Sequence, residues 1–295
     1  MRTGLVTDPI FDRHDTGPGH PERPARLPAV LRALEGLPLE AVEPRDASAE
    51  ELAAAHDPAY VRAVGERIRA GARSLDADTA VCPESYAAAV RAAGAALALG
   101  EALLAGRIEA GFACVRPPGH HACRGRAMGF CIFNNAAVLA RALRARGKRT
   151  CIVDWDVHHG NGTQDILWDD PEIGYLSLHQ HPLYPGTGRP DETGAGNILN
   201  LPLPAGSGDT EYLRAFDDRV LPWIGERDPD IVIVSAGFDA HRNDPLAGMQ
   251  LSSGAFGRFT EKLLGRPILG LLEGGYDLDG LAGSARAHVE ALVSG

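Results

Sequence analysis

The chain has 295 residues, of which 44% are hydrophobic, and this is enough to build one large α/β core or two ordinary ones. Its 29 Lys and Arg against 39 Asp and Glu give a net charge of −10, which disfavours binding to a nucleic-acid backbone and favours cationic partners only mildly. The five cysteines are scattered without a C-x-x-C pair, so they predict neither a disulfide framework nor a cysteine zinc site.

The sequence predicts a soluble protein without a membrane segment. No apolar run approaches the roughly 20 residues that a spanning helix needs, and the first 15 residues carry acids where a signal peptide needs an apolar stretch. We therefore expect a cytoplasmic protein whose cysteines are reduced, with several of them in the core.

Short apolar runs rich in β-forming residues recur along the chain and predict strands. They are residues 3–7, 111–115, 150–156, 174–179, 197–203, 230–237 and 267–275. Because most of these runs are apolar on both faces, they are typical of a mostly parallel sheet flanked by helices on both faces. Segments rich in Ala, Leu, Arg and Glu lie between them and predict helices, notably over 84–106, 135–146 and 211–225. This alternation predicts one α/β domain over residues 1–295.

Polar or glycine-rich clusters follow four of the predicted strands. The clusters are RPPGHHA (116–122), DWDVHHGNG (154–162), SAGFDAHRNDP (235–245) and EGGYD (273–277). A parallel sheet places its binding crevice beyond the carboxyl ends of its strands. We therefore expect the four clusters to meet at one rim of the sheet. Packing alone does not explain why four strands each end in such a cluster.

The cluster that starts at Asp154 predicts a metal site. Strand alternation places Asp154, Asp156 and His158 on one side of the chain. Asp156 and His158 can then bind one ion, and Asp239 can close a third corner. Two carboxylates and one imidazole leave a position open for water, as a catalytic zinc requires, and this hard donor set also suits ferrous iron. Taken singly, each residue is more simply a loop cap or a satisfied core histidine, but buried charges at neighbouring strand ends favour a shared cation.

Two further motifs supply proton-transfer chemistry. The RPPG turn presents His120 and His121 side by side, and imidazole is the side chain best suited to move protons near neutrality. Asp154 is a candidate to orient His120, and the neutral Asn161 is a candidate partner for His121. Tyr276, after two glycines, can donate a hydrogen bond to a carbonyl oxygen that becomes an oxyanion. Taken alone, the histidines would be read as a packing pair and the tyrosine as an ordinary turn residue.

In their order along the chain, these motifs resemble the histone deacetylase and acetylpolyamine amidohydrolase family. The matching stretches, from about residue 20 to Tyr276, are HPERPARL, RPPGHH, GFCIFNN, DWDVHHGNGTQ, SLHQHPLYPGTG, SAGFDAHRNDP and EGGYD. The resemblance implies one arginase-like α/β domain with a zinc-dependent deacylase site at the carboxyl rim of the sheet. It implies that Asp156, His158 and Asp239 are the metal ligands. It also implies that His120 and His121 are the proton-transfer pair and that Tyr276 polarises the carbonyl.

The resemblance also implies a substrate tunnel. Phe130 and Tyr184 match its two aromatic walls, where many relatives have Phe at the second place, and Gly129 and Leu246 lie beside them. Such walls bury the methylene chain of an acyl-lysine while its amide reaches the metal. Asp78 matches a rim position that hydrogen-bonds the substrate backbone in some relatives.

Two more sets of residues follow from the resemblance. In the mouth loop 14–24, His20 and Pro21 are candidates to contact the substrate. A structural potassium site is implied at Asp154 and Ser177, completed by the main-chain carbonyls of Asp156, His158 and Leu178.

Details of the motifs narrow the expected function to a class II-like deacylase. Asn161 stands where the class I branch carries Asp. Leu246 stands where a specialised polyamine deacetylase carries an acidic gatekeeper, so a cationic chain would find no counter-charge there. We expect acylated lysine in peptides or proteins as the substrate, with acetylated small amines as the alternative, and no nucleic-acid or membrane partner. The oligomeric state stays open.

Two further functions are less favoured. A manganese hydrolase of guanidine groups would need a D-x-H-x-D signature to build a two-metal site, and DWDVHH lacks the last Asp. A catalytically silent acyl-lysine binder would be expected to have lost a ligand or the tyrosine, and none of these residues is missing.

Overall fold

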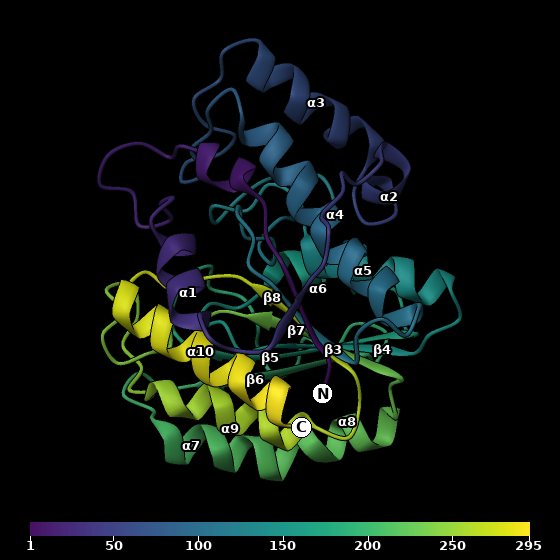
Figure 1. Cartoon of the computed structure of the whole chain (residues 1–295), viewed down its shortest axis with the longest axis vertical. Coiled ribbons are helices and arrows are strands. Elements are labelled where there is room, and N and C mark those ends of the chain that lie inside the picture. The colour runs from purple at the N-terminus through teal and green to yellow at the C-terminus, as the bar shows by residue number, and fades with distance from the viewer.

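Eight strands form one sheet through the middle of the structure, a computed structural model that describes residues 1–295 (Figure 1). Every neighbouring pair is parallel, and the strand order is β2-β1-β3-β8-β7-β4-β5-β6. The strands are β1 (Thr3–Val6), β2 (Leu39–Ala41), β3 (Ala110–Ala113), β4 (Thr150–Asp154), β5 (Ile173–Gln180), β6 (Ile198–Leu203), β7 (Ile231–Ala236) and β8 (Ile268–Leu272). The predicted α/β fold class is confirmed.

The burial of the strands explains why their sequences are apolar on both faces. Strands β3, β4, β5, β7 and β8 are buried along their whole length, because helices cover both faces of the sheet. The sequence did not reveal β2, since two of its three residues are exposed and it pairs only with β1 at the edge of the sheet.

Helices pack on both faces of the sheet. Helices α9 and α10 lie on one face, with α1 against α10, and α4 and α5 pack together on the other (Figure 1). The helical elements are η1 (Pro9–Arg13), α1 (Arg26–Leu34), α2 (Ala49–Ala53), α3 (Pro58–Arg69), α4 (Ser85–Leu104), α5 (Asn135–Ala145), α6 (Asn161–Leu167), α7 (Asp209–Ala215), η2 (Phe216–Val220), α8 (Leu221–Arg227), α9 (Ser253–Leu263) and α10 (Leu278–Ser294).

Two helix expectations need correction. The helix predicted over 211–225 is longer, since α7, the π-helical turn η2 and α8 follow one another from Asp209 to Arg227. Pro222 does not end it, since Pro222 lies in the first turn of α8 directly after the π-helical turn η2, and the helical segment continues through it. Helix α4 is long and apolar enough to span a membrane, contrary to the expectation that no run approaches that length. However, 72% of its most apolar window is buried inside the domain, as in the core helix of a soluble protein.

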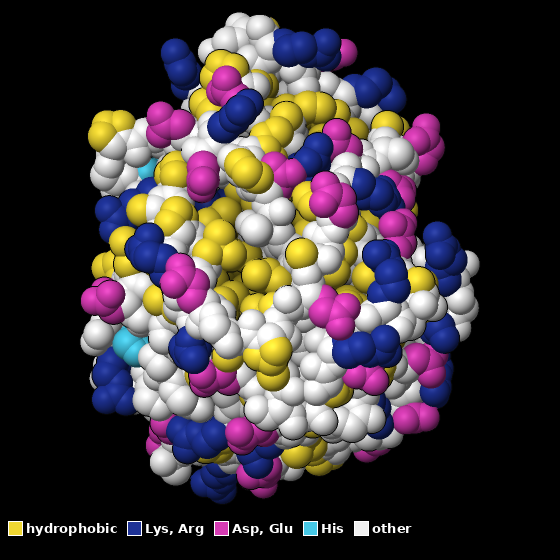
Figure 2. All heavy atoms as spheres, in the orientation of Figure 1, with side chains coloured by type: hydrophobic (Ala, Val, Ile, Leu, Met, Phe, Trp, Pro, Cys, Tyr) yellow, Lys and Arg dark blue, Asp and Glu magenta, His cyan; other side chains and the backbone are white.

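Cysteines and surface charge agree with the composition. All five cysteines are free and buried, as expected for reduced core residues. On the face drawn in Figure 2, basic and acidic side chains are interspersed, and no continuous basic patch covers that face.

Candidate active site

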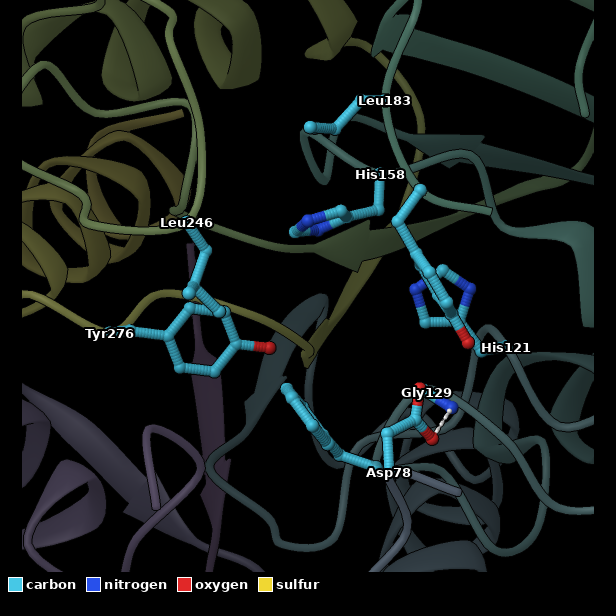
Figure 3. Close-up of a pocket in the computed structure, with 9 residues that line it drawn as sticks. Asp78, His121, Gly129, His158, Leu183, Leu246 and Tyr276 are labelled. Atoms are coloured by element: carbon cyan, nitrogen blue, oxygen red, sulfur yellow. Dashed lines mark hydrogen bonds between the residues drawn. The ribbon is translucent and has the colours of Figure 1, made fainter. Parts of the chain in front are cut away.

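A cavity of about 220 Å³ opens at the carboxyl ends of the strands. Its walls come from loops that follow β3, β4, β5, β7 and β8 and from the segment before α4 (Figure 3). The lining residues are Asp78, His121, Gly129, Phe130, His158, Leu183, Tyr184, Leu246 and Tyr276. The four polar clusters of the sequence therefore meet at one rim.

The chain leaves the sheet at Asp154, earlier than the strand pattern predicted. Strand β4 ends there, and side-chain caps replace the sheet hydrogen bonds. The Asp156 N–H donates to Asp154 Oδ1 (3.1 Å), and the His158 N–H donates to Asp156 Oδ1 (2.9 Å). Asp156 and His158 thus lie in a turn, so the argument from strand alternation is wrong for them although they do converge.

Asp156, His158 and Asp239 form a buried group whose ligand atoms all lie within 4.8 Å of one another. His158 Nδ1 is 3.1 Å from Asp156 Oδ1 and 3.1 Å from Asp239 Oδ2. The other oxygen of each carboxylate is held by the backbone. Gly274 N–H donates to Asp156 Oδ2 (2.9 Å), and Val157 N–H donates to Asp239 Oδ1 (2.8 Å). Both carboxylates are therefore fixed with one oxygen facing the imidazole.

The electrostatics of this group indicate that a cation belongs in it. Burial and the neighbouring Asp156 raise the pKa of Asp239 to about 7. Burial alone would lower the pKa of His158, but the two carboxylates raise it to about 10. Without an ion, a proton on His158 is the only positive charge shared by both carboxylates. A divalent ion would supply that charge to the same three atoms.

Two glycines leave room for this donor set. A Cβ on Gly237 would lie 2.1 Å from Asp156 Oδ2, and one on Gly274 would lie 2.2 Å from Asp239 Oδ2. Any larger residue would push the carboxylates out of place. The oxygen and nitrogen donors and the cramped backbone fit a small metal ion, and both zinc and ferrous iron accept this set.

The two predicted histidine pairings are present. His120 Nδ1 lies 3.1 Å from Asp154 Oδ2, which also accepts a hydrogen bond from the Tyr175 hydroxyl at 3.0 Å. His121 Nδ1 lies 2.8 Å from Asn161 Oδ1. The ring centroids of the two histidines are 4.0 Å apart. One imidazole thus faces a carboxylate and the other a neutral amide.

The different partners separate the two imidazoles electrostatically. Burial opposes charge on both rings, but Asp156 and Asp154 outweigh it and hold the pKa of His120 well above its usual value. Burial together with the neighbouring His120 and His158 holds the pKa of His121 well below its usual value. A cationic and a neutral imidazole therefore lie side by side.

Tyr276 points its hydroxyl into the cavity (Figure 3). Burial raises the pKa of this phenol well above 10, so it keeps its proton and can donate a hydrogen bond. Its backbone N–H donates to Asp244 Oδ2 (2.7 Å), and the Arg26 guanidinium carbon lies 5.2 Å from the ring centroid. Arg26 Nε also donates to the Gly275 carbonyl (2.7 Å). The loop that carries the tyrosine is therefore held from two sides.

The walls of the cavity are largely apolar. Phe130 has a positive φ of 68°, which turns its side chain toward Tyr276, and the two ring centroids are 5.9 Å apart. Asp78 Oδ1 accepts from the Gly129 N–H (2.9 Å), the bond marked in Figure 3. Burial and the negative charge of the nearby Asp78 raise the pKa of the Tyr184 hydroxyl. The rim carboxylate thus holds the backbone next to Phe130.

Other predicted residues lie outside the cavity. His20 packs its ring edge against Phe130 at 4.7 Å between centroids, and neither His20 nor Pro21 lines the cavity. The structure pairs Asp154 with Ser177 across β4 and β5, and the Ser177 hydroxyl lies 2.9 Å from His179 Nδ1. The potassium site, with its carbonyls from Asp156, His158 and Leu178, stays a prediction.

Several residues that support the site were missed from the sequence. Arg26 and Glu22 lie within the HPERPARL stretch, and Glu273 begins EGGYD, but nothing in those motifs showed what they contact. Glu273 Oε2 accepts from the backbone N–H groups of Gly119 (2.6 Å) and His120 (3.1 Å), and burial raises the pKa of its carboxyl to about 7. These side chains hold the backbone of the catalytic loops.

The arrangement can be compared with known proteins. The histone deacetylase domain matches residues 20–292, which is most of the chain. The chain belongs to the histone deacetylase family. A probable deacetylase of Archaeoglobus fulgidus is 35% identical over 100% of this chain and 87% of its own length. An uncharacterized protein of Synechocystis is 44% identical over 98% of this chain and 99% of its own length.

Plant deacetylases are similar as well. Histone deacetylase 15 of Arabidopsis thaliana is 42% identical over 93% of this chain, which spans 53% of that longer protein. The crystal structure of the HDA15 HD domain superposes with a TM-score of 0.96 at 38% identity, covering 99% of this chain and 88% of the other. The histone deacetylase family is hydrolytic and typically metal-dependent, so these relatives assign this chain to the deacetylases and imply acetylated substrates. Two plant relatives are named chloroplastic, and the cytoplasmic location expected here stays a prediction.

Proposed function

We propose that this histone deacetylase family member is a metal-dependent deacylase that removes acetyl or longer acyl groups from the ε-amine of lysine side chains in peptides and proteins. The observation that supports the proposal is the apolar cavity, whose aromatic walls Phe130 and Tyr184 lead to His158, His121 and Tyr276. A methylene chain fits such walls because its apolar surface is buried there while its amide reaches the polar end.

Asp156, His158 and Asp239 would hold the metal, zinc in the first instance and ferrous iron as the alternative. A divalent ion in this position supplies a Lewis acid that polarises an amide carbonyl and lowers the pKa of water toward about 7. The rest of the chemistry belongs to side chains of the chain itself.

The histidine pair would move the protons of the hydrolysis. With Nδ1 directed at Asn161, His121 presents Nε2 as an acceptor for the proton of the attacking water. His120, held cationic by Asp154 and Asp156, stabilises the negative charge that develops beside it. The proton taken up by the pair is then given to the leaving amine, so the products are a free amine and a carboxylic acid.

Tyr276 would bind the oxyanion. Its phenol keeps its proton and faces the cavity, so it can donate to the carbonyl oxygen as the carbonyl carbon becomes tetrahedral. A preorganised donor of this kind contributes on the order of 10²-fold or more in rate.

The charges around the cavity favour acyl-lysine over an acetylated polyamine. Leu246 is a neutral, exposed lining residue, so a cationic polyamine would find no counter-charge at that wall. Asp78 is the one carboxylate that lines the cavity, and it already accepts from the Gly129 N–H and the Thr79 hydroxyl. Acetylpolyamine hydrolysis is the alternative.

The test measures turnover of three substrates by the zinc-loaded protein. The substrates are an acetyl-lysine peptide, a longer acyl-lysine peptide and an acetylated polyamine, and the measurement is repeated with ferrous iron. Tyr276→Phe should lower kcat by about 10²-fold or more with little change in KM. Tyr212→Phe is the matched control, because that buried hydroxyl has no hydrogen-bond partner and lies outside the cavity.

The ranking of the three substrates decides the substrate class. Preference for a peptide supports a lysine deacylase, and preference for the polyamine overturns the substrate assignment. If metal and an acyl-lysine peptide bind but nothing turns over, the protein is a silent acyl-lysine binder and the proposal is wrong.

A further inference from the structure

Two sulfur atoms contact the amide of Asn161 on the side opposite His121. Asn161 Oδ1 lies 2.8 Å from His121 Nδ1, while Asn161 Nδ2 donates to Met128 Sδ at 3.3 Å and to Cys123 Sγ at 3.4 Å. The amide is therefore placed between one imidazole and two sulfurs. The contact with His121 was predicted from the sequence, whereas the two contacts with sulfur were not.

The thioether of Met128 selects one orientation of this amide. A thioether sulfur has lone pairs but no hydrogen, so it accepts from an NH₂ group and has nothing to donate to an amide oxygen. If the amide of Asn161 were rotated by half a turn, its oxygen would face the Met128 sulfur without a donor. The observed orientation satisfies both ends of the amide, whereas the rotated one leaves the amide oxygen against the Met128 sulfur without a donor.

Cys123 adds to this preference. Its thiol lies 3.6 Å from the His121 carbonyl oxygen, to which the S–H donates, so the sulfur lone pairs are left to accept from Asn161. Burial raises the pKa of this thiol, so the S–H donor is retained at neutral pH. Cys123 is thus oriented by the same histidine whose ring the amide contacts.

The backbone of one loop places both sulfurs. Cys123 N–H donates to the Arg126 carbonyl at 3.0 Å, which closes a first tight turn. Met128 and Cys131 exchange backbone hydrogen bonds of 3.3 Å and 2.9 Å, which close a second. The sulfurs are therefore held by the loop that follows the histidine pair, independently of the metal ligands.

The orientation of the amide decides which nitrogen of His121 carries the proton. An amide oxygen only accepts, so it requires Nδ1–H on the imidazole and leaves Nε2 as the acceptor. A rotated amide would donate to Nδ1 instead and place the proton on Nε2. A histidine in that tautomer cannot take a proton from water at Nε2. In other histidine-dependent hydrolases, the incorrect tautomer of the histidine causes a large loss of kcat.

We propose that Met128, assisted by Cys123, is a positioning residue that holds the Asn161 amide with its oxygen toward His121 and thereby keeps His121 in the Nδ1–H tautomer. This inference rests on the proposed function only in the role that it gives to His121 as proton acceptor. It goes beyond that function because it assigns a task to two residues that touch neither substrate nor metal.

The first test is a double-mutant cycle on zinc-loaded protein with an acetyl-lysine peptide. Met128→Leu keeps the approximate volume but removes the acceptor, and kcat should fall about three- to tenfold with KM little changed. In an Asn161→Asp background, the same change should have almost no effect on kcat. A carboxylate presents an acceptor oxygen to His121 whichever way it is turned, so no orientation is left to protect.

The second test observes the tautomer directly. Protein labelled with ¹⁵N in its histidine rings, with the His121 signals assigned by comparison with His121→Gln, should show a protonated Nδ1 and a bare Nε2 in the wild type at pH 7. Met128→Leu should move the population toward protonated Nε2. Asn161→Asp should return the Nδ1–H pattern in the presence of Met128→Leu.

The outcomes separate this inference from the proposed function. Equal losses of kcat from Met128→Leu in the wild-type and Asn161→Asp backgrounds would mean that Met128 acts by packing alone, and an unchanged His121 tautomer would overturn the inference as well. The ring spectra need no turnover. If the wild type hydrolyses none of the substrates, the proposed function fails while the spectra still decide the role of Met128.

Discussion

Replacing Glu22 with Gln should destabilise the protein at neutral pH and loosen the loop of Tyr276. Glu22 is fully buried and pairs with two fully buried guanidinium groups, Arg116 through both carboxylate oxygens and Arg26 at 3.1 Å. Arg26 also donates to carbonyls of the loop at Glu273 and Gly275. The substitution would leave two buried cations without a carboxylate, and one of them holds the catalytic loop.

The pKa of Glu22 gives the magnitude of the effect. Burial alone would raise this pKa, but Arg116 and Arg26 lower it from 4.5 to about 2. This difference corresponds to about 3 kcal/mol of stabilisation at pH 7. Because the pKa is lower in the folded state, the stabilisation is fully present above about pH 4.5 and is lost as the pH falls toward 2. About 1.4 kcal/mol should remain at pH 3.

The assay is guanidinium chloride unfolding of metal-free wild type and Glu22→Gln between pH 7 and pH 3. The free-energy difference between the two proteins should be about 3 kcal/mol at pH 7 and less than half of that at pH 3. Glu66→Gln is the control, because Glu66 is exposed on α3 and its substitution should stay within about 0.5 kcal/mol. A difference that stays constant over this pH range, or one no larger than the control, would refute the reasoning.

Three further changes have defined outcomes. Gly274→Ala places a Cβ against the metal-binding carboxylates and should weaken zinc binding by about 10- to 100-fold in a competition assay with a chelator. Tyr184→Phe removes a polar hydroxyl close to the Asp78 carboxylate, so that carboxylate should be freer to bind substrate, and KM for an acetyl-lysine peptide should fall a few-fold without a change in kcat. Leu246→Glu introduces a counter-charge and should raise kcat/KM for an acetylated polyamine relative to a peptide by about tenfold.

Each of these changes has a control or a contradicting result. Gly254→Ala, at a glycine whose nearest atom to an added Cβ is 3.8 Å away, should leave zinc affinity unchanged. A higher KM for Tyr184→Phe would show that the hydroxyl itself binds substrate. Leu246→Gln should not reproduce the selectivity of Leu246→Glu, and equal shifts for both would mean that size, not charge, sets the preference.

Residues near one another in sequence determined the fold class and the outline of the site. The buried strands are apolar on both faces, and this local property alone indicates a parallel sheet with helices on both sides. The motifs at the strand ends identified Asp156, His158 and Asp239 as candidate metal ligands, because carboxylates and imidazole after apolar strands need a charge partner. The pairings of His120 and His121 also followed from residue type.

Tertiary structure alone decided how those residues are held. Gly274 N–H binds the carboxylate of Asp156 from 118 positions away, so its need for glycine is invisible in the local sequence. Glu22 and Arg26 look like ordinary surface charges in HPERPARL, yet they are buried beneath the loop of Tyr276. Met128 looks like a core residue until its sulfur meets the amide of Asn161. Local sequence reports periodicity and residue chemistry, whereas the orientation of a polar group depends on the atoms that the fold brings against it.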